Sequence, residues 1–190
     1  IFGYADGMSY GVVSASNYKA TFFDGECAVI ATDIPAEEQG TGMLFNMDGE
    51  VVGMISSSVW NDTGKNVVNA YGISDLKPII ELLINGKSVP YIGIYGTTVT
   101  EQLAEEHKMP SGIYVADVDP DSPAMAAGIQ IGDIICEASG EEIKDIAAYQ
   151  NIVIGSSVGE TMEFVGKRLG SDGYVNIKFS VVTTEKEEVK

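Results

Sequence analysis

Residues 122–135 read Ser-Pro-Ala-Met-Ala-Ala-Gly-Ile-Gln-Ile-Gly-Asp-Ile-Ile, and this stretch decides the fold of the second half of the chain. Ser122 can cap a helix, and Gly128 can end it within two turns. The segment from Asp133 to Ala138, which contains Ile134, Ile135 and Cys136, then predicts a strand. A short helix, a glycine turn and a strand in this order are typical of a small α+β domain.

The same alternation continues on both sides of this stretch. Strands and helices are predicted from period-2 and period-3.6 apolar patterns. The predicted strands are 91–95, 113–118, 162–168 and 174–182, the last two forming a hairpin, and the predicted helices are 100–107 and 146–153. We expect the strands to form a small barrel with two helices against it.

Two segments carry a family resemblance. Tyr91-Ile92-Gly93-Ile94 and the run 122–135, together with Gly140 and Ile143, resemble the PDZ domain of the HtrA family. The resemblance covers residues 88–190, which we predict to be one domain.

A peptide-binding site is predicted at the first of these segments. A glycine turn can direct successive backbone N–H groups at one point, which suits a carboxylate. The resemblance implies that Ile92, Gly93 and Ile94 bind the free carboxylate of a polypeptide, whose backbone extends along the strand edge that follows. The expected ligands are C-terminal or unfolded polypeptide segments with an apolar last residue.

The pocket for that last side chain is expected on the helix 146–153. The candidates are Tyr149, Ile152 and Val153. The alternative is that these three residues belong to the core, as most sets with helical spacing do.

Residues 1–87 are predicted to be mainly β. Short apolar runs alternate with turn signals such as Asp24-Gly25 and Asp48-Gly49, and the segment 74–84 has the pattern of an amphipathic helix. Gly11-Val12-Val13-Ser14 and the hairpin 44–53 resemble the second β-barrel of an HtrA trypsin-like protease domain. The predicted fold class is therefore mainly β with α: a partial trypsin-like barrel followed by an α+β PDZ domain.

The nucleophile loop departs from the family pattern Gly-Asn-Ser-Gly-Gly-Pro-Leu. Aligned backwards from Leu44, the chain has Gly40 at the serine position, and glycine cannot form an acyl-enzyme. Aligned forwards from Asp33, Thr41 takes that position as a weaker candidate. Glu37 and Glu38 would add the wrong charge for an oxyanion. The resemblance is thus to a serine endopeptidase with a disabled nucleophile, and no catalytic residue is expected.

The rest of a catalytic triad is also missing from this sequence. The single histidine, His107, lies in the PDZ half, and the family's base and its carboxylate partner belong to a first barrel that does not occur in these residues. The start at Ile1 suggests a fragment or a processed product. The alternative function is an active quality-control endopeptidase with an upstream base and Thr41, or a serine among 56–58, as nucleophile. A third reading, acid/base catalysis by the two neighbouring glutamates, has little support.

Composition excludes further classes of function. The 28 acidic and 11 basic residues give a net charge of −17, which disfavours nucleic acid and anionic membranes as partners. No apolar run approaches the ~18 residues of a membrane span. Cys27 and Cys136 are expected to be free and buried, and neither a metal nor a cofactor is expected. The resemblance implies the missing barrel and further copies of the chain as partners, and an extracytoplasmic location in the periplasm or at the cell surface.

Overall fold

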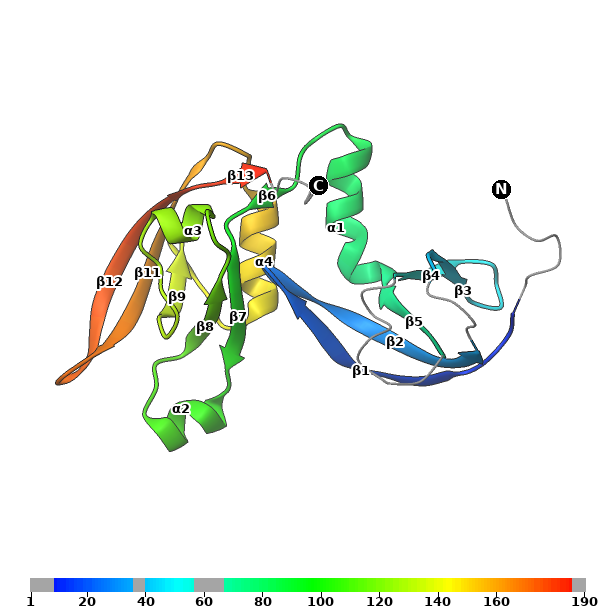
Figure 1. The fold of residues 1–190 in the computed structure, drawn as a ribbon, viewed down its shortest axis with the longest axis horizontal. Helices are drawn as coiled ribbons and strands as arrows, with labels where there is room; N and C mark the ends of the chain where they lie inside the picture. The colour runs from blue at the N-terminus through cyan, green and yellow to red at the C-terminus, as the bar shows by residue number, and fades with distance from the viewer. Residues whose placement is uncertain (1–8, 36–39, 57–66, 186–190) are drawn as a thin grey trace. The chain divides into compact units, whose positions relative to one another are not determined.

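The computed structural model describes residues 9–35, 40–56 and 67–185. Contacts divide the chain into two compact units (Figure 1). The first contains residues 1–20 and 27–77, and the second contains residues 21–26 and 78–190. The predicted boundary followed residue 87, whereas the contacts place it after Lys77 and assign the tip of an early hairpin to the second unit.

The first unit is built on an antiparallel sheet of five strands. Along the sheet the order is β1-β2-β5-β4-β3. The strands are β1 (Val13–Phe22), β2 (Gly25–Pro35), β3 (Gly42–Phe45), β4 (Val51–Ile55) and β5 (Val67–Gly72). In the described residues the sheet is open, with β1 and β3 at its edges. The strands of the expected partial barrel therefore do not close into a barrel in this part of the chain.

Local sequence explains the hairpin between β3 and β4. Gly49 adopts the left-handed φ of 81° that the turn needs. The side-chain oxygen of Asn46 accepts hydrogen bonds from the N–H groups of Asp48 and Glu50, at 3.0 and 2.9 Å. The Asp48-Gly49 signal therefore correctly predicted this hairpin.

Helix α1 (Ile73–Ile84) follows β5. It begins one residue before the segment 74–84 that the apolar pattern predicted, so Ser74 lies inside its first turn. Asp75 in that turn accepts a hydrogen bond from the N–H of Ala28 in β2, at 2.7 Å. This bond ties the start of the helix to the sheet.

The second unit is an α+β fold around one apolar core (Figure 1). Its main sheet has the order β12-β11-β9-β8-β7, β10 pairs with β9, and β13 pairs with β6. The strands are β6 (Pro90–Tyr91), β7 (Ile94–Val99), β8 (Gly112–Val118), β9 (Ile134–Ala138), β10 (Glu141–Glu142), β11 (Thr161–Gly170), β12 (Gly173–Val182) and β13 (Thr184–Glu185). The helices are α2 (Glu101–His107), α3 (Pro123–Ala126) and α4 (Ile146–Gly155).

The stretch 122–135 folds as its residues predict. The Ser122 side chain accepts a hydrogen bond from the N–H of Met125 at 3.2 Å and so caps α3. Gly128 leaves the helix with a φ of 88°. Asp133 is completely buried. Its carboxylate accepts one hydrogen bond from the N–H of Gln130, in the turn before it, and another from the side chain of Arg168 in β11.

Candidate carboxylate-binding site

The predicted strand 91–95 is interrupted by a turn at Gly93. This residue has a φ of 94°, and a Cβ there would lie 2.4 Å from the Cβ of Ser122. The carbonyl groups of Ile92 and Gly93 accept hydrogen bonds from the N–H groups of Ala124 and Asp119, at 2.9 Å each. These bonds hold the turn, and glycine is required both by the backbone angle and by the close approach.

The N–H groups of this turn converge on one carboxylate, that of Asp24. The N–H groups of Ile92 and Gly93 donate to its Oδ2, at 2.7 Å each, and the N–H of Ile94 donates to its Oδ1 at 2.9 Å. The Tyr149 hydroxyl also donates to Oδ1, at 2.6 Å. Three consecutive amides and a phenol therefore form a binding site for a carboxylate.

Asp24 comes from the turn between β1 and β2, the hairpin tip that belongs to the second unit. Its backbone has a left-handed φ of 63°, and only 8% of the residue is exposed. Its own N–H donates to the carbonyl of Ile94 at 2.7 Å, so backbone and side chain both contact the start of β7. We name residues 21–26 the Asp24 tip.

Burial sets the electrostatics of the site. Desolvation raises the pKa of Asp24 above 3.8, although the hydrogen bonds from Tyr149 and the three amides act in the opposite direction. Burial, followed by the nearby Asp24 charge, holds the pKa of Tyr149 well above 10.0. Tyr149 therefore stays protonated and acts as a donor. Tyr91, whose pKa is raised by burial, donates its hydroxyl to the carboxylate of Asp119 beside the turn.

Helix α4 and strand β7 supply further contacts of the Asp24 tip. The helix is capped by Asp145, whose side chain accepts from the N–H of Ala148 at 2.7 Å. Gln150 accepts a hydrogen bond from the N–H of Glu26 at 3.1 Å. The ring of Phe23 packs edge-on against Tyr95 of β7, with 5.8 Å between centroids. The tip thus lies between the start of β7 and α4.

A small cavity of about 110 Å³ opens beside the tip. It is mostly apolar and is lined by Phe22, Phe23, Asp24, Ile79, Val89, Pro90, Tyr91, Gln150, Val153 and Ile154. Val153 therefore lines this cavity, although it is itself 1% exposed and also part of the core.

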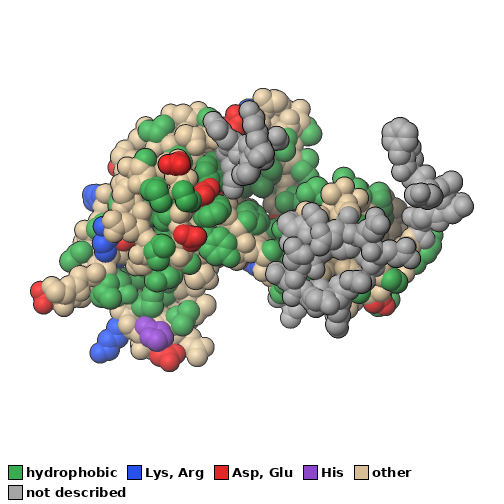
Figure 2. Space-filling view, in the orientation of Figure 1, with side chains coloured by type: hydrophobic (Ala, Val, Ile, Leu, Met, Phe, Trp, Pro, Cys, Tyr) green, Lys and Arg blue, Asp and Glu red, His purple; other side chains and the backbone are tan. Residues whose placement is uncertain are grey.

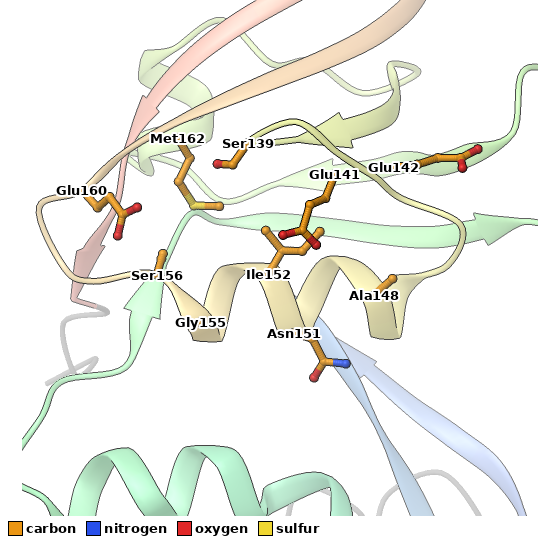
Figure 3. A pocket seen from close by; sticks show the side chains of 10 residues that line it. All are labelled: Ser139, Glu141, Glu142, Ala148, Asn151, Ile152, Gly155, Ser156, Glu160 and Met162. Carbon is orange, nitrogen blue, oxygen red and sulfur yellow. The ribbon is translucent and has the colours of Figure 1, made fainter.

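The three helix candidates are divided between two places. Tyr149 contacts the carboxylate and is fully buried, while Ile152 lines a different cavity of about 440 Å³. Figure 3 shows the Ile152 side chain pointing from α4 towards Glu141 and Met162. The structure thus brings Ile92, Gly93, Ile94, Tyr149 and Val153 together around the Asp24 tip and leaves Ile152 apart.

Sequence reasoning missed Asp24 and Gln150. Asp24-Gly25 is visible as a turn signal, and two phenylalanines precede it. An acid that follows apolar residues at a hairpin tip resembles an apolar chain end with its carboxylate. That was the available signal, but the 68 to 70 residues between Asp24 and the turn hid the pairing.

The predicted nucleophile positions, Gly40 and Thr41, lie directly before β3. Gly40 is exposed, and no atom lies within 4 Å of the place a Cβ would take. Thr41 is also exposed. Glu37, Glu38, Ser57 and Ser58 fall outside the described residues, whereas Ser56 is described and directly follows β4. His107 is the exposed last residue of α2, in the second unit.

The cysteines, metal ligands and apolar segments of the described residues bear on the remaining predictions. Both cysteines are free, as predicted. Cys27 is buried, but Cys136 is only half-buried, so the prediction that Cys136 is buried was wrong. No group of three metal-ligating side chains was found in the described ranges, and no helix there has the length and apolar character to cross a bilayer. Figure 2 shows acidic side chains dispersed over the visible face of the second unit.

Comparison with known proteins shows which proteins the chain resembles. A family model described as "PDZ domain" matches residues 114–168. The probable periplasmic serine endoprotease DegP-like of Halomonas elongata is 30% identical in an alignment of 183 positions, gaps included, that covers 93% of this chain and 38% of that protein. The chain is homologous to the HtrA serine proteases over most of its length. The DegP-like protein of Ectopseudomonas mendocina matches the HtrA homologue with 30% identity in an alignment of 195 positions, gaps included, that covers 99% of this chain and 41% of that protein.

Solved structures show the same fold. The HtrA-type protease AlgW with a tripeptide matches with a TM-score of 0.62 at 21% identity, over 99% of this chain and 63% of that one. The serine endoprotease of Yersinia pestis matches with a TM-score of 0.57 at 24% identity, over 98% of this chain and 59% of that one. The HtrA homologue thus spans well under half of its two curated relatives and carries a PDZ domain.

Proposed function

We propose that this HtrA homologue binds the free C-terminal ends of polypeptides at the turn formed by Ile92, Gly93 and Ile94. The observation that carries the proposal is the convergence of three backbone N–H groups on one carboxylate, at 2.7 to 2.9 Å. Charge-assisted bonds of this kind are short and strong, and they do not depend on the ligand's sequence. A peptide's terminal carboxylate has the same chemistry as the Asp24 group seen there.

Selectivity is proposed to come from the neighbouring apolar surface. The cavity beside Val153 and Tyr91 favours an apolar last side chain, and the edge of β7 offers backbone groups to an extended segment. Two of the similar structures are of AlgW with a decapeptide and with a tripeptide, which supports this proposal. Unfolded polypeptides would present such ends in the extracytoplasmic location that the periplasmic relatives suggest.

The test compares a labelled hexapeptide ending in valine as the free acid with the same peptide amidated at its end. Binding is measured by fluorescence anisotropy. The free acid is expected to bind about tenfold or more tightly, since the amide loses a charge-assisted bond. Equal affinity of the two peptides would contradict the proposal.

A matched pair of glycine variants localises the binding. Gly93→Ala places a methyl group 2.4 Å from Ser122 at a left-handed position, whereas Gly159→Ala meets no atom within 4 Å at a similar φ of 85°. Both variants carry backbone strain, but only the first disturbs the turn. Loss of free-acid binding in Gly93→Ala alone is expected, with folding checked by circular dichroism. Unimpaired binding by the Gly93→Ala variant would show that the peptide binds at another place on the protein.

We also propose that these residues do not themselves cleave peptide bonds. Gly40 offers no nucleophile, and the one histidine of the sequence is an exposed residue of α2. No turnover of unfolded casein is expected, either before or after Thr41→Ala. Proteolysis abolished by Thr41→Ala would favour the alternative of an active endopeptidase, and the same pair of assays on the longer parent protein would extend the test.

A further inference from the structure

We propose that the Asp24 tip is an internal ligand of the carboxylate-binding turn and must leave before a peptide C terminus can bind there. This inference rests on the proposed function, because it concerns the same site. It assigns the hairpin between β1 and β2 the role of a built-in competitor.

Asp24 reproduces the groups that a terminal residue would offer. A C-terminal residue presents one backbone N–H and one carboxylate, and Asp24 presents its N–H to Ile94 and its carboxylate to the three amides. The carboxylate is on a side chain one carbon longer than a true chain end. The left-handed φ of 63° turns the side chain back toward the amides while the main chain continues. Aspartate is among the few residues that tolerate this conformation.

The residues on either side of Asp24 suit the same site. Before it, Phe22 and Phe23 supply apolar side chains to the cavity, and Phe23 contacts Tyr95 of β7. After Asp24, the chain continues out of the site between the turn and α4, whereas a bound peptide would end at this point. Gly25 permits this exit, because a Cβ there would lie 2.6 Å from the Gln150 side chain.

Occupation by the tip and by a peptide are mutually exclusive. Each of the three N–H groups has one proton, which is already donated to Asp24 at normal hydrogen-bond length. A second carboxylate would also be repelled by the first across a site that is almost closed to water. A peptide can therefore bind only to molecules in which the tip has moved out.

The tip is held tightly enough to compete but not irreversibly. Its ionised carboxylate loses water on burial, which offsets part of the energy of its hydrogen bonds. An incoming peptide has the same carboxylate and, in addition, a backbone that pairs along β7. The apparent dissociation constant equals the intrinsic constant divided by the fraction of open molecules.

The first experiment measures the occupant without any ligand. Amide hydrogen exchange at Ile92, Gly93 and Ile94 is compared in the 190-residue chain and in the variants Asp24→Asn and Asp24→Gly. Both replacements suit a left-handed φ, so the hairpin backbone remains unstrained. Asp121→Asn is the matched control, because Asp121 is an exposed aspartate with a φ of 61° beside the same turn. Faster exchange of the three amides is expected in the Asp24 variants and not in the control.

The second experiment measures competition with the valine-ended hexapeptide. Both Asp24 variants are expected to bind the free acid roughly tenfold more tightly, the gain for a tip that fills the site about nine-tenths of the time. Asp121→Asn is expected to leave the affinity unchanged.

The outcomes separate this inference from the proposed function. Binding of equal strength by the unmodified chain and both Asp24 variants would overturn the inference and leave the proposed function intact. Unchanged amide exchange in both variants would also overturn it. If the variants show fast exchange but bind no free-acid peptide, the proposed function fails, and with it competition by the tip.

Discussion

Asp24 is a buried acid whose protonation affects stability in a defined direction. Burial raises its pKa above 3.8 in the folded state, so the folded protein binds this proton more tightly than the unfolded chain does. The stability contributed by the group is therefore complete below 3.8 and is lost as the pH rises through the raised value. Tyr149 and Tyr91 do not titrate in this range, because their pKa values are raised above 10.0.

We expect this titration to appear as a difference between two proteins. The free energy of unfolding of the unmodified chain minus that of Asp24→Asn should decrease as the pH rises from about 3.8 through the raised pKa, and then become constant. Urea unfolding followed by tyrosine fluorescence at several pH values measures it. A difference that grows with pH over this range would mean that the hydrogen bonds outweigh desolvation.

Cys27 gives a second prediction at the residue scale. Its side chain is fully buried in β2, and burial, followed by the charge of Asp75, raises its pKa from 9.0 to about 11. The thiolate, which is the reactive form, is therefore scarce at pH 8. In a Cys136→Ser variant, the remaining thiol should react with iodoacetamide at least roughly a hundredfold more slowly in the folded than in the unfolded chain, since both exposure and ionisation are lost. Equal rates, followed by mass spectrometry, would show that β2 opens easily.

At the scale of elements, one ion pair ties the turn before β9 to β11. Arg168 donates to both oxygens of Asp133, at 2.6 and 2.7 Å, and also to the carbonyl of Gly128 at 3.0 Å. Asp133 is completely buried, whereas the Arg168 side chain is 33% exposed. The pair explains why an acid occurs in the middle of an otherwise apolar stretch.

Removing the arginine should therefore destabilise the second unit. Arg168→Ala leaves a buried charge without its partner, and we expect a loss of about 3 kcal/mol in the free energy of unfolding. Lys167→Ala is the matched control, because the hydrogen bond that Lys167 makes within the described ranges is to the exposed Asn176, and its loss should change stability by under about 0.5 kcal/mol. Equal effects of the two substitutions in urea titrations would contradict this account.

Elements with local signals could be predicted from sequence. The stretch 122–135 and the Asp48-Gly49 hairpin carry their caps and turns within a few residues, and both fold as predicted. The prediction of one strand over 91–95 was only partly correct, because the chain turns at Gly93 and so directs the N–H groups of residues 92–94 to one point. The Asp24 contact was not predictable from local pattern, since it depends on a hydrogen bond across 68 to 70 residues. The same limit applies to Ile152, whose helical spacing alone did not distinguish the two sides of α4.

At the scale of the whole molecule, ligand binding should change the accessibility of a segment far away in the sequence. A bound peptide displaces the Asp24 tip and so uncovers Phe23, which is half-buried in the closed form. Chymotrypsin is then expected to cut after Phe23 several times faster with the free-acid peptide than with its amide, because cleavage follows the open population. Asp24→Gly should be cut quickly without peptide. Cleavage mapped by mass spectrometry that is insensitive to the peptide would contradict displacement.

Asp24 belongs to the same chain as the site that it fills, so the competition with a peptide does not depend on the concentration of the protein. A separate inhibitor dissociates on dilution, but a tethered one meets its site at an effective concentration that the intervening backbone alone determines. The ligand level at which half the molecules respond would then be the same whether a cell makes few copies or many. Evolution could adjust that threshold with a single substitution at the hairpin, without altering the groove that recognises the ligand.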